Sequence, residues 1–537
     1  MKQTGASYRD AIASRARPSL ATASAIVAAG FLGSRLLGLG RSVAIAHSFG
    51  TSPELDAYWV AFRLPDLIFQ MLAGAALGAA FIPTFARMFT KDGEEAAWRL
   101  TSSVLNLITI ATFVFAVIGF LLAPVLVPLI APGLGEGTGR QEEIRSLAVD
   151  LTRLMMLSPI LFSVGGMFMA ILNARHHFLF PALAPMIYNI SIIIGAVAFD
   201  SVHALAAAVV IGAGLHLLIQ MPALFQIGMR YSPIAQWSDA AVREVGRLMG
   251  PRVLGLGAFQ VNLLITTFFA SNVGEGSISA INYAWLVIMA PLGLFGMAIS
   301  TAVFPTLAEQ AVDRRDELRR TLVRSIRMIL FLTIPSSIGI IVLSTPLVTF
   351  LFRHGAFTDA SSGVTRDALI FYSIGLFAHA AIEILSRGFY ALSDTRTPVA
   401  FALVALAANL ILSVILVGPL EVRGLALAVS LASIANAGLL FWRLNERLGG
   451  LDLRVLGQAL GRTLIAVALM AEIMAFYLIL LHEANHLNTG SFFDAFLALA
   501  GGGLLGGVIF LATARALRLD EVETLLRRVP WPKRAVA

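Results

Sequence analysis

The chain has 537 residues, of which 58% are hydrophobic and only 13% are charged, and its mean hydropathy is +0.83. Because a soluble domain carries about 25% charged residues, this composition excludes an ordinary soluble protein and indicates an all-α, polytopic membrane protein. The chain contains no cysteine, which excludes disulfides, zinc–thiolate sites and iron–sulfur clusters.

The N-terminal segment, residues 1–19, is polar and basic, and the apolar run that follows is too long for the core of a signal peptide. We therefore expect that run to be a retained membrane helix. Apolar runs near twenty residues recur along the whole chain, and they predict about fourteen transmembrane helices. The predicted helices span residues 20–46, 57–83, 101–130, 147–172, 178–199, 203–228, 252–271, 279–304, 328–352, 367–386, 398–418, 424–442, 463–481 and 491–514.

The basic residues fall mainly on one side of these helices. With the N-terminus in the cytoplasm, 30 of the 39 Lys and Arg residues lie in cytoplasmic segments, five lie in external loops and four lie within helices, where Arg252, at the first position of its predicted helix, is counted as cytoplasmic. This asymmetry predicts that both termini are cytoplasmic. It also accounts for the net charge of +7 as a topological signal beside anionic lipid, so we expect membrane lipids as partners and no nucleic acid.

The sequence contains an internal repeat. GSRLLGLG at 33–40 matches GPRVLGLG at 250–257 in six of eight positions, and Asn189 matches Asn409 at a nearly equal offset. The repeat predicts two lobes of six helices each, an N-lobe at 20–240 and a C-lobe at 241–447. Two further helices are predicted within 448–514, and 515–537 form a cytoplasmic tail.

Each predicted lobe has an even number of helices, so both have the same orientation in the membrane, as in alternating-access transporters that hold their substrate between two lobes. The repeated glycines, Gly38 and Gly40, either allow the first helix to bend or allow neighbouring helices to pack closely; the sequence leaves both readings open.

Charged residues inside the predicted helices are candidates for function, because each is costly in a bilayer. Arg35 and Arg41 lie six residues apart, about 120° around and roughly 9 Å along a straight helix. Arginine grips phosphate oxygens through a planar fork of donors. In the next predicted helix, Arg63 either lines a cavity or pairs with Asp66, three residues later.

The sequence also contains a motif that is typical of a different functional class, the zinc proteases. His482-Glu483-Ala484-Asn485-His486 matches H-E-x-x-H, in which two histidines on one helix face bind zinc and the glutamate acts as base. The motif lies in a short polar loop that Leu487-Asn488-Thr489-Gly490 follows, and no third ligand is evident on the same side of the membrane. An intramembrane zinc protease is therefore the remote alternative, and we expect no bound metal and no enzymatic activity.

Several stretches resemble the MurJ (MviN-type) lipid II flippases of the multidrug/oligosaccharidyl-lipid/polysaccharide exporter superfamily. They are SRLLGLGR (34–41), DAYWVAFRLPD (56–66), AAFIPTF (79–85), LFRHGAFT (351–358) and RGFYALSDTRTP (387–398). The resemblance implies fourteen helices and a non-enzymatic transporter of the bacterial inner membrane. Its implied substrate is the undecaprenyl-pyrophosphate-linked precursor of peptidoglycan, moved from the inner to the outer leaflet.

The resemblance also implies site residues. Arg35 and Arg41 match the family's two arginines of the first helix, Asp56 its acidic residue before the second, and Arg63 the basic residue of its F-K/R-L-P-N motif. We add Arg252, the repeat partner of Arg35. The position that matches Arg41 is Ala258, so Arg41 is unique to the first lobe and is the stronger candidate for substrate contact, whereas Arg35 is expected to be partly structural. The predicted substrate-binding set is therefore Arg35, Arg41, Asp56, Arg63 and Arg252.

The sequence departs from the family where other charges are usual: it has Phe69, Gln70 and Gly74 in the second helix and Leu286 in the eighth. Because of these departures, a second substrate remains an alternative, namely another polyprenyl-linked glycan or amphipathic molecule. No residue set specifies a cofactor, and either the membrane potential or a cation is left as the energy source. Cell-wall synthesis proteins are further expected partners.

Overall fold

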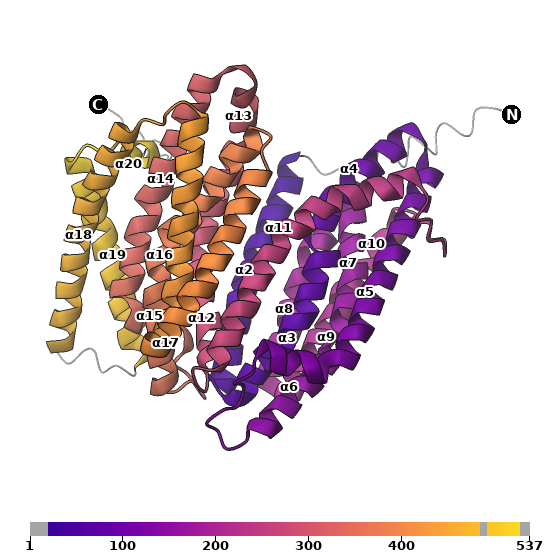
Figure 1. Cartoon of the computed structure of the whole chain (residues 1–537), viewed down its shortest axis with the longest axis horizontal. Helices are drawn as coiled ribbons and strands as arrows, with labels where there is room; N and C mark the ends of the chain where they lie inside the picture. Colours follow the sequence, from indigo (N-terminus) through magenta and orange to yellow (C-terminus); the bar gives the residue numbers. More distant parts are fainter. Residues whose placement is uncertain (1–19, 484–490, 527–537) are drawn as a thin grey trace, which may run out of the picture. The chain divides into compact units, whose positions relative to one another are not determined.

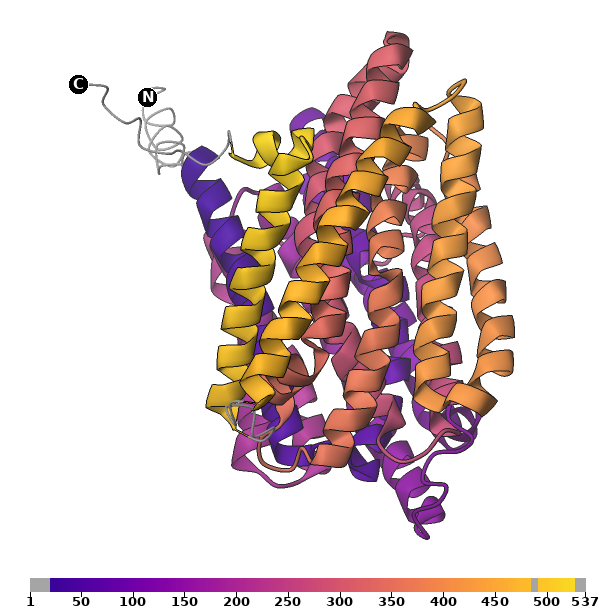
Figure 2. The same cartoon turned by 90° about the vertical axis from the view of Figure 1, so that its left-hand side faces the viewer.

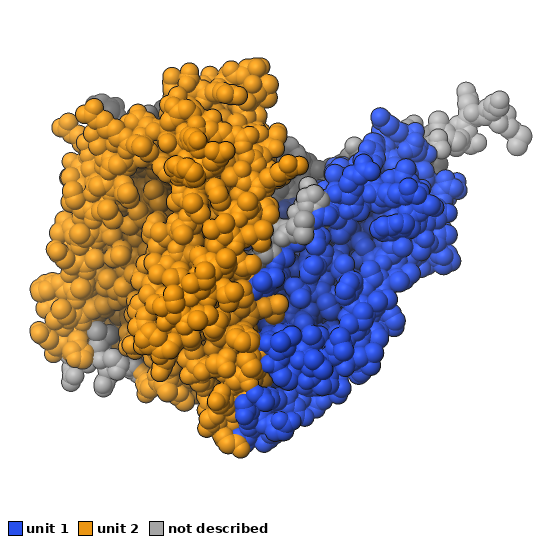
Figure 3. Space-filling view, in the orientation of Figure 1, with its two compact units in different colours: residues 1–48, 57–130, 140–261 blue, residues 49–56, 131–139, 262–537 orange. Residues whose placement is uncertain are grey.

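The computed structural model describes residues 20–483 and 491–526, and within them every regular element is helical (Figures 1 and 2). Twelve of the helices are long and apolar enough to cross a membrane. Helices suit this setting because each satisfies its own backbone hydrogen bonds in lipid. The described residues divide into two compact units, which Figure 3 colours separately.

Unit 1 comprises residues 1–48, 57–130 and 140–261. A core around Phe81, Phe85 and Trp98 packs α4, α5 and α7 together. The helices that lie wholly or mainly in this unit are α2 (Leu20–Phe49), α3 (Pro53–Leu72), α4 (Ala75–Lys91), α5 (Glu94–Ile130), α6 (Gln141–Met155), α7 (Leu157–Ala174), α8 (Leu179–Ala198), α9 (Val202–Leu218), α10 (Met221–Gln226) and α11 (Ala240–Ser271).

Unit 2 comprises residues 49–56, 131–139 and 262–537. Phe331 of α14 packs on Phe510 of α19, and α18 and α19 run side by side in Figure 2. The helices of this unit are α12 (Ser277–Pro291), the π-helix η1 (Leu292–Met297), α13 (Ala298–Asp313), α14 (Arg315–Val342), α15 (Ser344–Phe352), α16 (Asp359–Ala391), α17 (Arg396–Arg447), α18 (Leu453–Glu483), α19 (Phe492–Ala516) and α20 (Asp520–Leu526).

The count of twelve differs from the predicted fourteen at two places. The predicted helices 398–418 and 424–442 both lie within the 52-residue α17. They are separated by Glu421, whose φ of 52° and ψ of −129° are not helical, so the predicted break is present. The predicted helix 252–271 lies inside α11, whose apolar part, Gln260–Ser271, is short. The remaining predicted helices each overlap an observed one, so the all-α polytopic fold is confirmed.

Two predicted helices have different internal structure from a plain α-helix. The second is divided at Gly74, whose ψ of −156° ends α3 and starts α4. The eighth continues through η1 directly after Pro291, because proline lacks the N–H that an α-helix needs at that point.

The asparagines of the repeat make related contacts in the two units. Asn189 of α8 donates to the carbonyl of Ser34 in α2 at 3.4 Å, and Asn409 of α17 donates to Oδ1 of Asn262 in α11 at 2.7 Å. In each unit, the repeated asparagine therefore ties its helix to the helix that carries the repeated glycine motif. The proposed lobe boundaries at 240 and 447 stay a prediction.

The glycines of the first helix have two different settings. A Cβ at Gly30 would meet Ala182 of α8 at 2.4 Å, and one at Gly33 would meet Met186 at 2.9 Å. At Gly38 and Gly40, a Cβ would meet no described atom within 4 Å. Close packing therefore explains the first pair and not the second.

Candidate functional site

Unit 1 contains a cavity of about 400 Å³, within the range of small-molecule binding sites. Its walls come from α2, α3, α7, α8 and α9. Most of the wall is aromatic, and it contains one arginine and one carboxylate. The lining residues are Arg41, Tyr58, Trp59, Phe62, Asp66, Phe69, Phe162, Met169, Pro185, Tyr188 and His216.

Helix α3 supplies the largest share of this lining. Tyr58, Phe62, Asp66 and Phe69 follow one another at intervals of four and three residues, which places them on one face of a helix. Pro65 lies within the same helix and leaves the carbonyl four residues earlier without its usual partner. The motif that suggested a functional segment thus presents a continuous face to the cavity.

Arg41 is the predicted site residue that lines this cavity. Its Nε is buried and makes no hydrogen bond to the described residues. The indole Nε1 of Trp59, in the same wall, is also buried without a partner. A buried donor without an acceptor is costly, so both groups favour a ligand that carries oxygen acceptors.

The carboxylate of the cavity is held by two amides. Asp66 accepts a hydrogen bond from Nε2 of Gln260 at 3.1 Å and from Nε2 of Gln70 at 3.4 Å. Gln70 lies four residues after Asp66 on α3, and its amide thereby orients the carboxylate.

The other rings of the cavity come from helices far along the chain. Phe162 of α7 contacts Phe69, Tyr188 and His216, with ring centroids 5.2, 4.9 and 5.4 Å away. No sequence motif pointed to Phe162, Tyr188 or His216. Each is one ring on a predominantly aliphatic helix, and α7 and α8 each contain another aromatic residue that does not line the cavity.

The remaining predicted arginines lie elsewhere. Arg35 is exposed on α2, with its guanidinium carbon 5.1 Å from the centroid of the Phe31 ring. Arg63 is half-buried on α3 and is not among the residues that line the cavity. Arg252 lies within α11, and its side chain is outside the described part of the structure.

Asp56 is buried and caps a helix of unit 2. It accepts hydrogen bonds from the backbone N–H of Gly276 at 2.9 Å, from that of Ser279 at 2.8 Å and from the Ser279 hydroxyl at 2.5 Å. These donors lie at the N-cap and in the first turn of α12, where the helix leaves its N–H groups unpaired. The described contacts of Asp56 therefore position a helix.

Close backbone packing in this region requires glycine at two positions. Gly276, directly before α12, has φ of +75°, and a Cβ there would lie 2.5 Å from the carbonyl oxygen of Thr51. Gly50 has φ of +59°, and a Cβ there would lie 2.4 Å from the carbonyl oxygen of Ala356. Only glycine fits both the backbone angle and the space at these positions.

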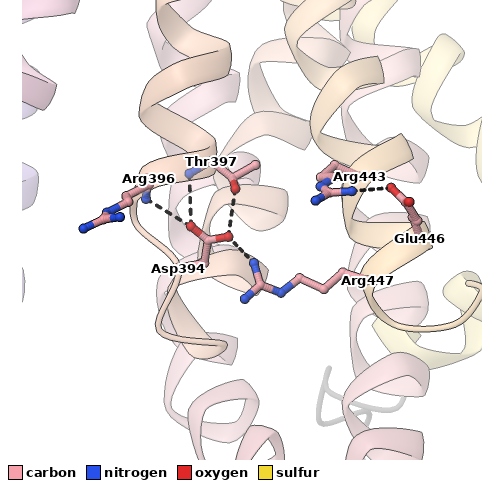
Figure 4. Close-up of polar contacts among 6 residues, drawn as sticks. All are labelled: Asp394, Arg396, Thr397, Arg443, Glu446 and Arg447. Atoms are coloured by element: carbon pink, nitrogen blue, oxygen red, sulfur yellow. Dashed lines mark hydrogen bonds and ion pairs between the residues drawn. The ribbon is translucent and has the colours of Figure 1, made fainter.

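A second polar cluster lies in the RGFYALSDTRTP stretch, between α16 and α17 (Figure 4). Asp394 accepts from the backbone N–H groups of Arg396 and Thr397, at 3.1 and 3.0 Å, and from the Thr397 hydroxyl at 2.8 Å. Arg447, at the far end of α17, donates to the same carboxylate. Burial raises the pKa of Asp394, but the hydrogen bonds from Thr397 and the charge of Arg447 outweigh it, so that the pKa lies below its ordinary value.

The H-E-x-x-H motif extends beyond the described residues. His482 and Glu483 end α18, while residues 484–486 lie outside the part that the structure describes. Within residues 20–483 and 491–526, no group of three or more His, Asp or Glu side chains is placed to hold a metal ion.

Comparison with known proteins identifies close relatives over most of the chain. Residues 45–496 match the family model described as "Lipid II flippase MurJ". The chain is 31% identical to the probable lipid II flippase MurJ of Thermotoga maritima, over 92% of this chain and 96% of that protein. It is 32% identical to the lipid II flippase MurJ of Burkholderia cenocepacia, over 77% of this chain and 81% of that protein.

Solved structures give the same result. A lipid II flippase MurJ in an inward closed conformation matches with a TM-score of 0.75 and 26% identity, covering 91% of this chain and 99% of that one. An inward-facing MATE-family multidrug resistance transporter of the MOP superfamily matches with a TM-score of 0.62 and 17% identity, covering 77% and 94%. The second likeness concerns the fold alone.

Proposed function

Because the chain belongs to the lipid II flippase MurJ family, we propose that it moves the undecaprenyl-pyrophosphate-linked precursor of peptidoglycan from the inner to the outer leaflet. The chain is a multi-pass protein of the bacterial inner membrane, and the proposed activity is transport without a chemical step. One observation links the proposed function to a particular residue: Arg41 lines the unit 1 cavity.

Arg41 is the proposed contact of the pyrophosphate. A guanidinium forms bidentate hydrogen bonds with phosphate oxygens, and its own Nε has no acceptor among the described residues. Arg35 is exposed beside Phe31, and we propose that it has a different role: it contacts lipid headgroups or the substrate outside this cavity. Arg63, Arg252 and Asp56 remain proposed site residues, with Asp56 acting through α12.

Both termini are proposed to be cytoplasmic, from the distribution of Lys and Arg. No resident cofactor is proposed. The energy source we favour is the membrane potential acting on arginines within the membrane, since each charge moved across 100 mV corresponds to about 2.3 kcal/mol. A coupling cation is the alternative, and proteins of cell-wall synthesis are proposed partners.

The test is rescue of bacterial cells depleted of their own lipid II flippase. We expect the wild-type chain to restore growth and Arg41→Ala to abolish rescue at an equal membrane level. The matched control is Arg99→Ala, which removes an exposed arginine of the same unit that pairs only weakly with Glu95 at 4.0 Å.

The outcomes separate the two levels of the proposal. Normal rescue by Arg41→Ala would remove Arg41 from the site and leave the function intact. Failure of the well-expressed wild-type chain to rescue would favour the second candidate, export of another polyprenyl-linked glycan. The observation behind that candidate is the uncharged side chain of Phe69 in the cavity wall.

A further inference from the structure

The unit 1 cavity has more features than a phosphate site needs. A bare phosphate requires donors and positive charge, and this cavity supplies one arginine for that purpose. Most of the rest of its wall is aromatic, with Met169 and Pro185 between the rings, and it contains one carboxylate and one indole N–H without an acceptor. The wall therefore fits something attached to the phosphate.

The aromatic rings present broad, flat surfaces. Tyr58 packs edge-on against Trp59, with ring centroids 5.4 Å apart, and Phe162 packs between Phe69 and Tyr188. Such surfaces bury the apolar C–H face of a flat, rigid ligand with little loss of conformational entropy, since aromatic side chains have few rotatable bonds.

The polar groups come in complementary kinds. Nε1 of Trp59 is a donor only, and Asp66 as a carboxylate is an acceptor only. The hydroxyls of Tyr58 and Tyr188 and the ring of His216, in the same wall, can each donate or accept. A ligand that satisfies both Trp59 and Asp66 must carry acceptors and donors close together around an apolar face. Hydroxyl groups do this, because each is at once a donor and an acceptor.

The charges argue against other ligand classes. An organic cation would suit the aromatic walls and Asp66, but the guanidinium of Arg41 lines the same cavity and repels it. A second anionic group would be repelled by Asp66. A neutral polyhydroxylated ring avoids both penalties.

We propose that the unit 1 cavity is a saccharide subsite, in which a pyranose ring packs on the aromatic wall, Trp59 donates to a ring substituent and Asp66 accepts from a hydroxyl. This rests on the proposed function, because the ring is the sugar joined directly to the pyrophosphate that Arg41 binds. Phe69 then has a role, because its ring, in contact with Phe162, supplies part of the stacking surface.

The test compares two soluble probes that share a diphosphate and differ by one sugar, UDP-N-acetylglucosamine and UDP. Binding to the purified full-length protein in lipid nanodiscs is measured by calorimetry. We expect the sugar-bearing probe to bind more tightly than UDP. Trp59→Phe keeps the ring and removes the donor, so it should weaken binding of the sugar-bearing probe by roughly 3- to 10-fold and leave UDP binding unchanged.

Two further variants sharpen the result. Phe162→Leu keeps an apolar side chain but removes the flat surface, and it should also lower the preference for the sugar-bearing probe. Trp237→Phe makes the same chemical change as Trp59→Phe at an exposed tryptophan of the same unit, and it should leave both affinities as they are. Size-exclusion profiles confirm that each variant is folded.

The subsite is overturned if the wild-type protein binds both probes equally, if it binds neither, or if Trp59→Phe preserves the sugar preference. Saturable binding of tetraethylammonium that UDP-N-acetylglucosamine displaces would also overturn it, in favour of an organic-cation site. These outcomes are distinct from failure of the proposed function, which the rescue assay decides: rescue without a sugar preference retains the transporter and rejects the subsite.

Discussion

Asp56 connects the start of α3 to the start of α12 within unit 2. Its carboxylate satisfies three donors of one helix turn, two of them backbone N–H groups that α12 cannot pair internally. The residues involved are more than 200 positions apart in the chain, so the contact joins distant parts of the sequence.

We expect Asp56→Ala to destabilise the protein by roughly 1–3 kcal/mol, because it leaves buried donors without an acceptor. Asp56→Asn keeps one carbonyl oxygen and should cost less. Thermal unfolding in detergent, followed by intrinsic fluorescence, measures both. Asp359→Ala removes an exposed carboxylate from the first turn of α16 that pairs with Arg353 at 2.6 Å. An exposed ion pair contributes little, so this variant should change the unfolding temperature little. Equal, small effects of the two alanine variants would contradict the capping role.

At the level of single residues, the sequence could rank intramembrane charges but could not place them. Arg41 was the stronger candidate of the two arginines on this helix because the repeat lacks a counterpart of it. The structure places the two apart: Arg35 is exposed beside Phe31, and Arg41 lines the cavity. The separation depends on which helices pack against α2. The partners of Arg41 in the cavity, such as Phe162 and Tyr188, come from α7 and α8, and no local pattern reveals that contact.

Among the elements, α17 is the helix whose ends are tied together. Asp394 binds the first turn, and Arg447 from the last turn reaches the same carboxylate (Figure 4). A 52-residue straight helix would be about 78 Å long at 1.5 Å per residue, so its two ends can meet only because the chain reverses at Glu421.

The Asp394 cluster predicts a pH dependence of stability. The folded-state pKa of Asp394 is below its unfolded value, so its stabilising contribution is present above about pH 4 and declines as the pH falls through the folded-state pKa. We expect Asp394→Asn to lower the unfolding temperature at pH 7, and the difference from wild type to shrink below about pH 4. Asp200→Asn, at an exposed loop carboxylate, serves as the control for the lost charge. A difference that stays constant with pH would contradict the role of the ionised carboxylate.

The sequence predicted helical elements well because a membrane helix needs a long apolar run, and such runs can be read directly. It predicted ends and breaks less well. The break between 418 and 424 was predicted from Gly418-Pro419 and the charges that follow, but the positive φ of Glu421, on a residue that is not glycine, was not. The start of α4 is set by Gly74, which has no side-chain cap.

For the whole molecule, the proposed orientation gives a direct test. The chain has no cysteine, so single-cysteine variants can be labelled without background. We expect Glu136→Cys, in the loop before α6, to react with a membrane-impermeant maleimide in intact cells. Asp313→Cys, at the end of α13, should react only after the membrane is permeabilised, because the Lys and Arg distribution places it in the cytoplasm. Both residues are exposed, and the reverse pattern would invert the topology.

The sequence repeat suggested that the chain consists of two successive halves, and the compact units are not successive. Unit 2 includes residues 49–56 and 131–139, which lie within the first half of the sequence. The second of these segments is fixed by Gly133, whose N–H donates to the Ser271 hydroxyl at 3.2 Å. The duplicated motifs show which helices of the two halves correspond. They do not show that two short segments of the first half belong to unit 2.

This interleaving has a consequence for how the gene can be divided. A polypeptide that begins at residue 262 lacks the carboxylate that caps α12 and the segment held by Ser271, although it contains all the helices from α12 to α20. Expressed alone, it would enter the membrane with the first turn of α12 uncapped. Two fragments divided at this point should regain their native stability only when they are co-expressed, and neither could be exchanged with the corresponding half of a relative without its two short segments.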